Sequence, residues 1–163
     1  MVSRKNIFIC LFQTIFVLFA LMGTSVADDR TMISLSRGQV VYVPVYSHIY
    51  IGNRERPFLL AVTLSIRNTD LNKAMVVKRA AYYNSQGKLL EEYINTPVAL
   101  EKMSATRFVV HESDKAGGSG ASFLVEWESE EPISPPIIES VMIGAKTQQG
   151  ISFTSRGRVL QEK

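Results

Sequence analysis

Four ring-bearing side chains lie at even spacing in one short segment: Tyr42, Tyr46, His48 and Tyr50. This spacing places all of them on one face of an extended strand. Tyrosine rings in such a row can stack on a sugar ring or a peptide, because each ring is flat, rigid and polar at its tip. The same spacing also fits rings that cover a second sheet face or pack under a loop. These residues are therefore our candidate ligand-binding residues, with the structural alternative open.

The alternate positions of this segment are aliphatic, which predicts a strand from Val40 to Ile51 with one buried face. Pro44 lies on the tyrosine side and predicts an edge strand or a bulge, because proline has no N–H to donate to a central ladder. The predicted core positions are Val41, Val43, Val45, Ile49 and Ile51.

A glycine-rich segment raises the possibility of phosphate binding or nucleophilic catalysis. Phosphate cradles connect a strand to a helix, whereas a strand pattern follows Gly120. Ser119 lacks the Gly-X-Ser-X-Gly turn of α/β-hydrolases, so that class is excluded. We therefore expect a flexible hairpin loop. Its residues include Asp114, Gly117, Gly118, Ser119 and Gly120.

The two histidines, His48 and His111, make an exported hydrolase an alternative hypothesis. The hydrolase hypothesis predicts that both histidines, or one histidine and an acidic residue, lie in a single pocket. A metal site would require both histidines to lie beside Glu112 or Asp114. Neither histidine belongs to a His-X-His or His-Glu-X-X-His pattern, and the acidic segment 126–131 lacks the spacing of a calcium loop. We assign no catalytic residue, no metal ligand and no cofactor, and expect a non-catalytic domain.

The N-terminal segment has the three parts of a secretory signal. Arg4 and Lys5 are positive, residues 7–22 form an apolar run, and Ser25-Val26-Ala27 supplies the small residues that a signal peptidase reads. The apolar run is shorter than the roughly 20 residues of a membrane-spanning helix. We expect cleavage after Ala27 and export to the periplasm or the exterior. Retention as an N-terminal membrane anchor is the alternative.

Charge and cysteine content narrow the partner classes. Arg4 and Lys5 are two of the 18 basic residues, so the exported part, with all 15 acidic residues, is nearly neutral and lacks the basic surface of a nucleic-acid-binding protein. The only cysteine, Cys10, lies in the apolar run, so the exported part has no disulfide and no thiolate site. The remaining partners are an envelope protein, a peptide or a glycan. We expect the protein to contact a membrane only if its N-terminal segment is not cleaved.

After residue 27 the sequence consists of short runs in which apolar and polar residues alternate, separated by turn residues about ten positions apart. It shows no sustained helical period. This pattern predicts an all-β fold: an antiparallel, immunoglobulin-like β-sandwich of about eight or nine short strands, preceded by an N-terminal signal helix. The expected divisions are signal 1–27, extension 28–38, one domain 39–160 and tail 161–163. The expected strands are 40–51, 58–67, 75–83, 89–94, 98–100, 106–111, 122–128, 137–145 and 151–160, with a hairpin turn at 84–87 and an extended crossing at 128–136.

Five segments carry a family resemblance: 42–50 (YVPVYSHIY), 64–70 (LSIRNTD), 114–121 (DKAGGSGA), 125–127 (VEW) and 150–158 (GISFTSRGR). Over residues 39–159 the chain resembles an uncharacterised family of exported bacterial proteins, domain of unknown function thirty-one twenty-four. The resemblance implies export and a single domain, and it implies no activity, because the family has no assigned reaction. Residues 64–106 also resemble immunoglobulin-like domains of the late-embryogenesis-abundant, stress-response type, which implies a sandwich and leaves a stress-protective role as a third hypothesis.

Overall fold

The structure is a computed structural model of the whole chain, and it describes residues 34–145 and 150–163. The chain divides into two compact units, residues 1–32 and 33–163, and the description concerns the second. The predicted signal helix and its cleavage site lie outside the described residues. Within the described ranges every regular element is a strand. No helix there is long and apolar enough to cross a bilayer.

All strand pairs are antiparallel, which confirms the prediction of an all-β, antiparallel fold. The described residues form twelve strands because three of the predicted strands, 40–51, 58–67 and 151–160, are each divided in two. The strands are β1 Ser36–Val45, β2 His48–Ile51, β3 Arg56–Leu59, β4 Ala61–Arg67, β5 Met75–Tyr83, β6 Leu89–Glu92, β7 Val98–Leu100, β8 Ala105–Val110, β9 Ala121–Ile133, β10 Ile137–Gly144, β11 Ile151–Arg156 and β12 Arg158–Glu162.

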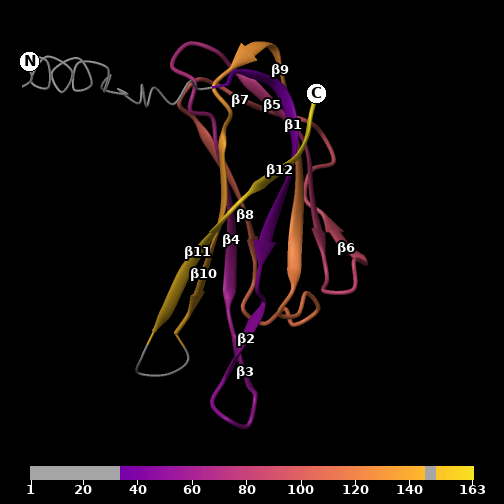
Figure 1. Cartoon of the computed structure of the whole chain (residues 1–163), viewed down its shortest axis with the longest axis vertical. Coiled ribbons are helices and arrows are strands. Elements are labelled where there is room, and N and C mark those ends of the chain that lie inside the picture. Colours follow the sequence, from indigo (N-terminus) through magenta and orange to yellow (C-terminus); the bar gives the residue numbers. More distant parts are fainter. Residues whose placement is uncertain (1–33, 146–149) are drawn as a thin grey trace, which may run out of the picture. The chain divides into compact units, whose positions relative to one another are not determined.

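These strands form two main sheets and one small hairpin (Figure 1). The six-stranded sheet has the order β12-β1-β9-β5-β6, with β7 also paired to β5. The four-stranded sheet has the order β11-β10-β4-β8, and β2 pairs with β3 alone. The strands before and after the β2–β3 hairpin, β1 and β4, belong to different main sheets. The hairpin therefore forms one of the connections between the two sheets.

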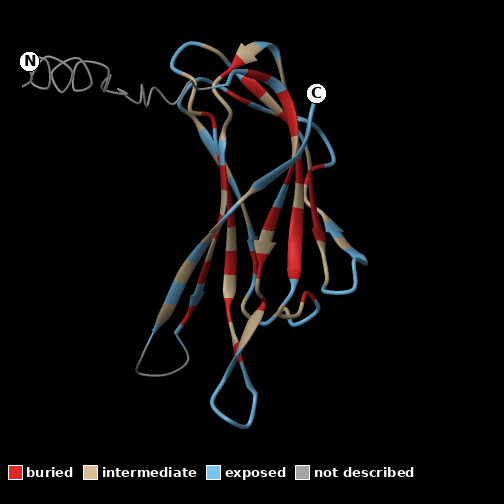
Figure 2. Ribbon diagram, viewed as in Figure 1, coloured by how far each residue is buried: buried red, intermediate tan, exposed pale blue. Residues whose placement is uncertain are grey.

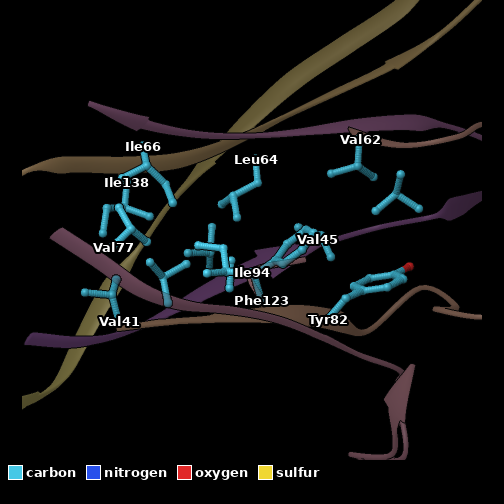
Figure 3. Packing of buried hydrophobic residues seen from close by; sticks show 14 of the residues in the cluster. Val41, Val45, Val62, Leu64, Ile66, Val77, Tyr82, Ile94, Phe123 and Ile138 are labelled. Carbon is cyan, nitrogen blue, oxygen red and sulfur yellow. The ribbon is translucent and has the colours of Figure 1, made fainter. Parts of the chain in front are cut away.

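Buried residues recur along the strands of both main sheets (Figure 2), and together they form one hydrophobic core. In β4, Val62, Leu64 and Ile66 are fully buried. Val45 and Phe123 from the six-stranded sheet belong to the same cluster (Figure 3). Each such side chain contributes about 1.5–3 kcal/mol when it leaves water. This shared core makes the fold sandwich-like, since apolar side chains hold two sheet faces together.

The prediction of one strand over 40–51 is wrong because the chain turns at Ser47. Ser47 is fully buried. Its N–H donates to the Gly118 carbonyl over 3.0 Å, and its carbonyl accepts from the Leu60 N–H over 3.0 Å. These bonds take the chain out of the six-stranded sheet and into β2. Ile51, predicted to be a core residue, is 41% exposed as a result.

The predicted strand 151–160 divides at Gly157, where the chain passes from the four-stranded to the six-stranded sheet. The Gly157 N–H donates to the Ile138 carbonyl over 2.8 Å. A Cβ at this position would lie 2.6 Å from Val41 Cγ1 and 2.9 Å from the Ile138 carbonyl oxygen. Only glycine fits so close a crossing.

Pro44 lies on a stretch of β1 that β12 does not pair, although β1 is an inner strand of the six-stranded sheet and not the predicted edge strand. β12 pairs with β1 only from Gln39 to Tyr42. The Gly38 carbonyl accepts from the Lys163 N–H, so backbone groups at even positions of β1 point toward β12. Pro44 faces the same side beyond the end of β12. Its missing N–H therefore interrupts no ladder.

In the acidic, proline-rich segment 128–136, the strand extends further than predicted. β9 runs past Pro132 to Ile133, so the crossing expected at 128–136 shrinks to residues 134–136. The register between β1 and β9 shifts between Ser36 and Gly38. Pro132 falls within this irregularity, where a missing donor breaks no regular ladder.

Candidate functional site

The β2–β3 hairpin gathers two of the candidate residues on one of its faces. The antiparallel register pairs His48 with Leu59 and Tyr50 with Pro57. Because side chains alternate along a strand, these four residues share one face, which we call the pocket face. Phe58 points to the opposite face, where it is 6% exposed and belongs to the core. The core thus anchors one face of the hairpin and leaves the pocket face free.

A hollow of about 410 Å³, the hairpin pocket, lies over the pocket face. Its walls are mostly apolar and aromatic. Lys115 reaches it from the glycine-rich loop between β8 and β9, far from the hairpin in sequence. The lining residues are His48, Tyr50, Pro57, Phe58, Leu59 and Lys115.

Two serines hold the glycine-rich loop beside the hairpin. Ser47 Oγ accepts from the Gly118 N–H over 2.8 Å. The Ser85 N–H and hydroxyl both donate to the Gly117 carbonyl, over 2.9 and 3.0 Å. Ser85 Oγ also accepts from the Gly120 N–H over 2.9 Å. The loop that we expected to be flexible is therefore hydrogen-bonded through three of its glycines.

Close packing explains two of these glycines. A Cβ at Gly117 would lie 1.8 Å from Tyr82 Oη, so any side chain there would collide with the ring below. Gly118 has a φ of +82°, a left-handed conformation that favours glycine. The glycines thus allow the loop to lie flat on Tyr82.

Tyr82 closes the core below this loop (Figure 3). Its ring is fully buried, 5.1 Å from the Phe123 ring centroid to centroid. Burial is the main cause that raises the pKa of Tyr82 to about 12; the charge of Asp114 adds to the rise and the Ser47 hydroxyl opposes it. Among the described residues, the Tyr82 hydroxyl has no hydrogen-bond partner of good geometry. Tyr82 is therefore a neutral support for the loop.

His48 and Tyr50 form a ring pair on the pocket face. The ring centroids are 5.1 Å apart with the planes at 85°, and His48 Nε2 lies 3.3 Å from the Tyr50 hydroxyl. His48 Nδ1 is buried and finds no hydrogen-bond partner within the described ranges. Tyr50 is 55% exposed. The pair offers a flat ring and a polar tip, and its histidine contacts a phenol rather than a carboxylate.

Tyr42 and Tyr46 lie elsewhere, so the four rings do not share one face. Tyr42 stands on the outer face of the six-stranded sheet, beside Leu124 and Arg158, and is 36% exposed. Tyr46 packs edge-on against Phe153, with 5.7 Å between ring centroids. The turn after β1 causes this division. Tyr46 therefore agrees with the structural alternative, in which the ring packs against the core and does not bind a ligand.

The second histidine lies in a different hollow. His111 lines a hollow of about 390 Å³ together with Glu91 and Asp114. The Asp114 carboxylate accepts from the Ala116 N–H over 2.7 Å. In the part of the chain that the structure describes, no three His, Cys, Asp or Glu side chains are grouped so that they could hold a metal ion. The fold therefore keeps His48 and His111 apart.

Sequence reasoning missed four lining residues: Pro57, Phe58, Leu59 and Lys115. The sequence predicts one strand over residues 58–67, whereas in the structure that strand divides after Leu59. The polar run 53–56 between two alternating segments is a hairpin signal that could have identified the pocket face. No local signal identifies Lys115, because tertiary contacts bring its loop to the hairpin.

Comparisons with known proteins give one family and one solved structure. A protein-family model described as "Protein of unknown function (DUF3124)" matches residues 38–160, a range that includes the hairpin pocket. The chain is similar to the crystal structure of Thermotoga maritima 1070, with a TM-score of 0.45 and 12% sequence identity over 78% of this chain and 97% of that one. No curated protein matches the chain significantly.

Proposed function

The chain belongs to the DUF3124 family of proteins of unknown function, and we propose that its domain is a non-catalytic module that binds a small ligand in the hairpin pocket. Because the family description names no reaction, support for this function comes from the pocket itself.

The lining of the hairpin pocket is the observation that carries the proposal. Ligand sites are hollows of roughly 300–1,000 Å³, mostly apolar, with a few polar groups that orient the ligand. The hairpin pocket has about 410 Å³, apolar walls from Pro57 and Leu59, and polar tips from Tyr50 and Lys115. Its hairpin wall is fixed from behind by the buried Phe58.

The surroundings of the two histidines favour binding over catalysis. A catalytic histidine is held by a hydrogen-bonded acid that fixes its tautomer. His48 instead lies against the Tyr50 hydroxyl. His111 shares its hollow with Asp114, but within the described ranges no hydrogen bond joins the two side chains, and the Asp114 carboxylate accepts the Ala116 N–H.

The proposal includes export to the periplasm or the exterior. It is supported by the basic start, the apolar run 7–22 and the Ser25-Val26-Ala27 segment. A peptide, a glycan or part of an envelope protein is then the source of the ligand. We also propose the immunoglobulin-like class of sandwich, which the antiparallel sheets around one core support.

Exchanging one exposed tyrosine for serine tests the location of the site. We expect Tyr50→Ser to weaken at least about tenfold the binding of a ligand found by NMR fragment screening, because the substitution removes an aromatic wall. Tyr42→Ser is the matched control, since Tyr42 is also exposed but lies on the six-stranded sheet. It should leave the affinity unchanged.

The opposite pattern would contradict the proposal. Loss of binding in Tyr42→Ser with full binding in Tyr50→Ser would place the site on the outer face of the six-stranded sheet. Thermal unfolding of both variants checks that neither substitution changes the fold.

A further inference from the structure

Resting on the proposed function of the hairpin pocket, we propose that its ligand is a small organic carboxylate with an apolar body, and that Lys115 binds the carboxylate group. Three features support this assignment: the charge of the lining, the freedom of Lys115, and the apolar walls.

The hairpin pocket carries charge of one sign only. Lys115 is the single lysine or arginine among its described lining residues, and no aspartate or glutamate lines it. His48 adds either no charge or a positive one. A bound cation would meet Lys115 with no compensating group, whereas a bound anion would gain an ion pair.

Lys115 is free to make that ion pair. Lys73, Lys78 and Lys163 each pair with a glutamate, at distances of 2.7 to 3.0 Å. Lys115 is exposed and pairs with no acidic residue in the described ranges. Its loop is tied down by serine hydrogen bonds, so the base of the side chain is fixed while its four-carbon stem can follow a ligand.

The neighbouring charges favour an anion as well. Asp114, next to Lys115 in sequence, lines the other hollow, and its carboxylate accepts from the Ala116 N–H. At the hairpin tip the exposed Arg54 and Arg56 outnumber Glu55. These arginines line a different hollow from the hairpin pocket, so they contribute only a general positive charge on the hairpin, which raises the local concentration of anions.

The walls determine the rest of the ligand. Pro57, Leu59 and the Tyr50 ring line the hollow with apolar surface, which favours an aliphatic or aromatic body. The volume of about 410 Å³ suits one ring with a short chain. A matched set of probes follows: 3-phenylpropionate, its neutral amide 3-phenylpropionamide, and the cation 3-phenylpropylamine.

Titration of the purified, isotope-labelled protein with these three probes, followed by NMR at the backbone amides of Leu59 and Lys115, tests the proposal. We expect the carboxylate to bind about fivefold more tightly than the amide, the size of an exposed ion pair, and the amine to bind most weakly. Lys115→Gln should remove the preference for the carboxylate. Lys88→Gln, on the exposed β5–β6 turn, is the matched control and should retain it.

The possible outcomes separate this inference from the function on which it rests. Equal binding of carboxylate and amide at the hairpin amides, unchanged in Lys115→Gln, overturns the carboxylate assignment and leaves the pocket as a binding site. Tighter binding of the amine also overturns the assignment. Absence of shifts at the hairpin with all three probes overturns both proposals.

Discussion

Gly117 and Tyr82 determine how closely the glycine-rich loop approaches the core. A Cβ at Gly117 would meet Tyr82 Oη at 1.8 Å and Ala121 Cβ at 3.0 Å. The loop that carries Lys115 therefore keeps its position only with glycine at this point. The pocket wall depends on the packing of one residue that never touches a ligand.

Gly117→Ala should lower the free energy of unfolding by about 1–3 kcal/mol, because the new methyl group must displace the buried Tyr82 ring or the loop. Tyr82→Phe removes the hydroxyl that the methyl group would meet, so the double variant should recover part of this loss. Urea unfolding of the single and double variants measures both effects.

Gly120→Ala is the control for this prediction in the same loop. Its Cβ would lie 3.4 Å from Ser85 Oγ, an ordinary contact, so we expect a change below about 0.5 kcal/mol. Equal destabilisation by both alanines would show that loop flexibility, and not the approach to Tyr82, decides the stability of this region.

Among the elements, β12 is held to β1 by a chain of polar groups that begins in the core. The buried Trp127 Nε1–H donates to Gln39 Oε1 over 3.3 Å. Gln39 Nε2–H and the Ser36 hydroxyl donate to the two carboxylate oxygens of Glu162, over 2.7 and 2.6 Å. Glu162 thereby ties the C-terminal strand to two residues of β1.

Glu162→Ala should release β12. We expect faster hydrogen exchange at the amides of 158–162 and a loss of about 1–3 kcal/mol in the free energy of unfolding, because the buried Gln39 amide loses its acceptor. Glu130→Ala, at an exposed position of β9, is the matched control and should leave both quantities unchanged. Unaltered hydrogen exchange in β12 of Glu162→Ala would show that the backbone hydrogen bonds between β1 and β12 are enough to hold β12 in place.

For the described unit as a whole, stability depends on apolar burial that includes aromatic residues with titratable hydroxyls. Tyr82 and Phe123 lie in the shared core, and Tyr93 packs against it. Burial is the main cause that raises the pKa of both tyrosines. The two sheets are therefore sensitive to strong alkali.

The folded protein should lose stability between pH 10 and about 12, because Tyr82 keeps a proton that the unfolded chain has released. The contribution is complete below the unfolded pKa of 10.0 and is lost as the pH rises through the folded pKa of about 12, with a slope of about 1.4 kcal/mol per pH unit. Urea unfolding at a series of alkaline pH values measures the slope. Tyr82→Phe should make it shallower, and an unchanged slope would assign the effect to other groups.

The alternation of apolar and polar residues, together with the turn residues, determined much of this fold. Strands 75–83 and 98–100 have the predicted bounds, and Val41, Val43 and Val45 are buried as expected. Gly87 takes a positive φ in the predicted turn. These features follow from alternation and turn chemistry, which depend on neighbours in sequence.

The tertiary structure alone decided where strands divide and which residues line the pocket. Ser47 turns out of the six-stranded sheet because it bonds Gly118, which lies 71 residues away. That bond separates Tyr50 and His48 from Tyr42 and Tyr46, and it brings the loop of Lys115 to the hairpin. A period along the chain carries no information about such contacts, because they arise only when both sheets close on one core.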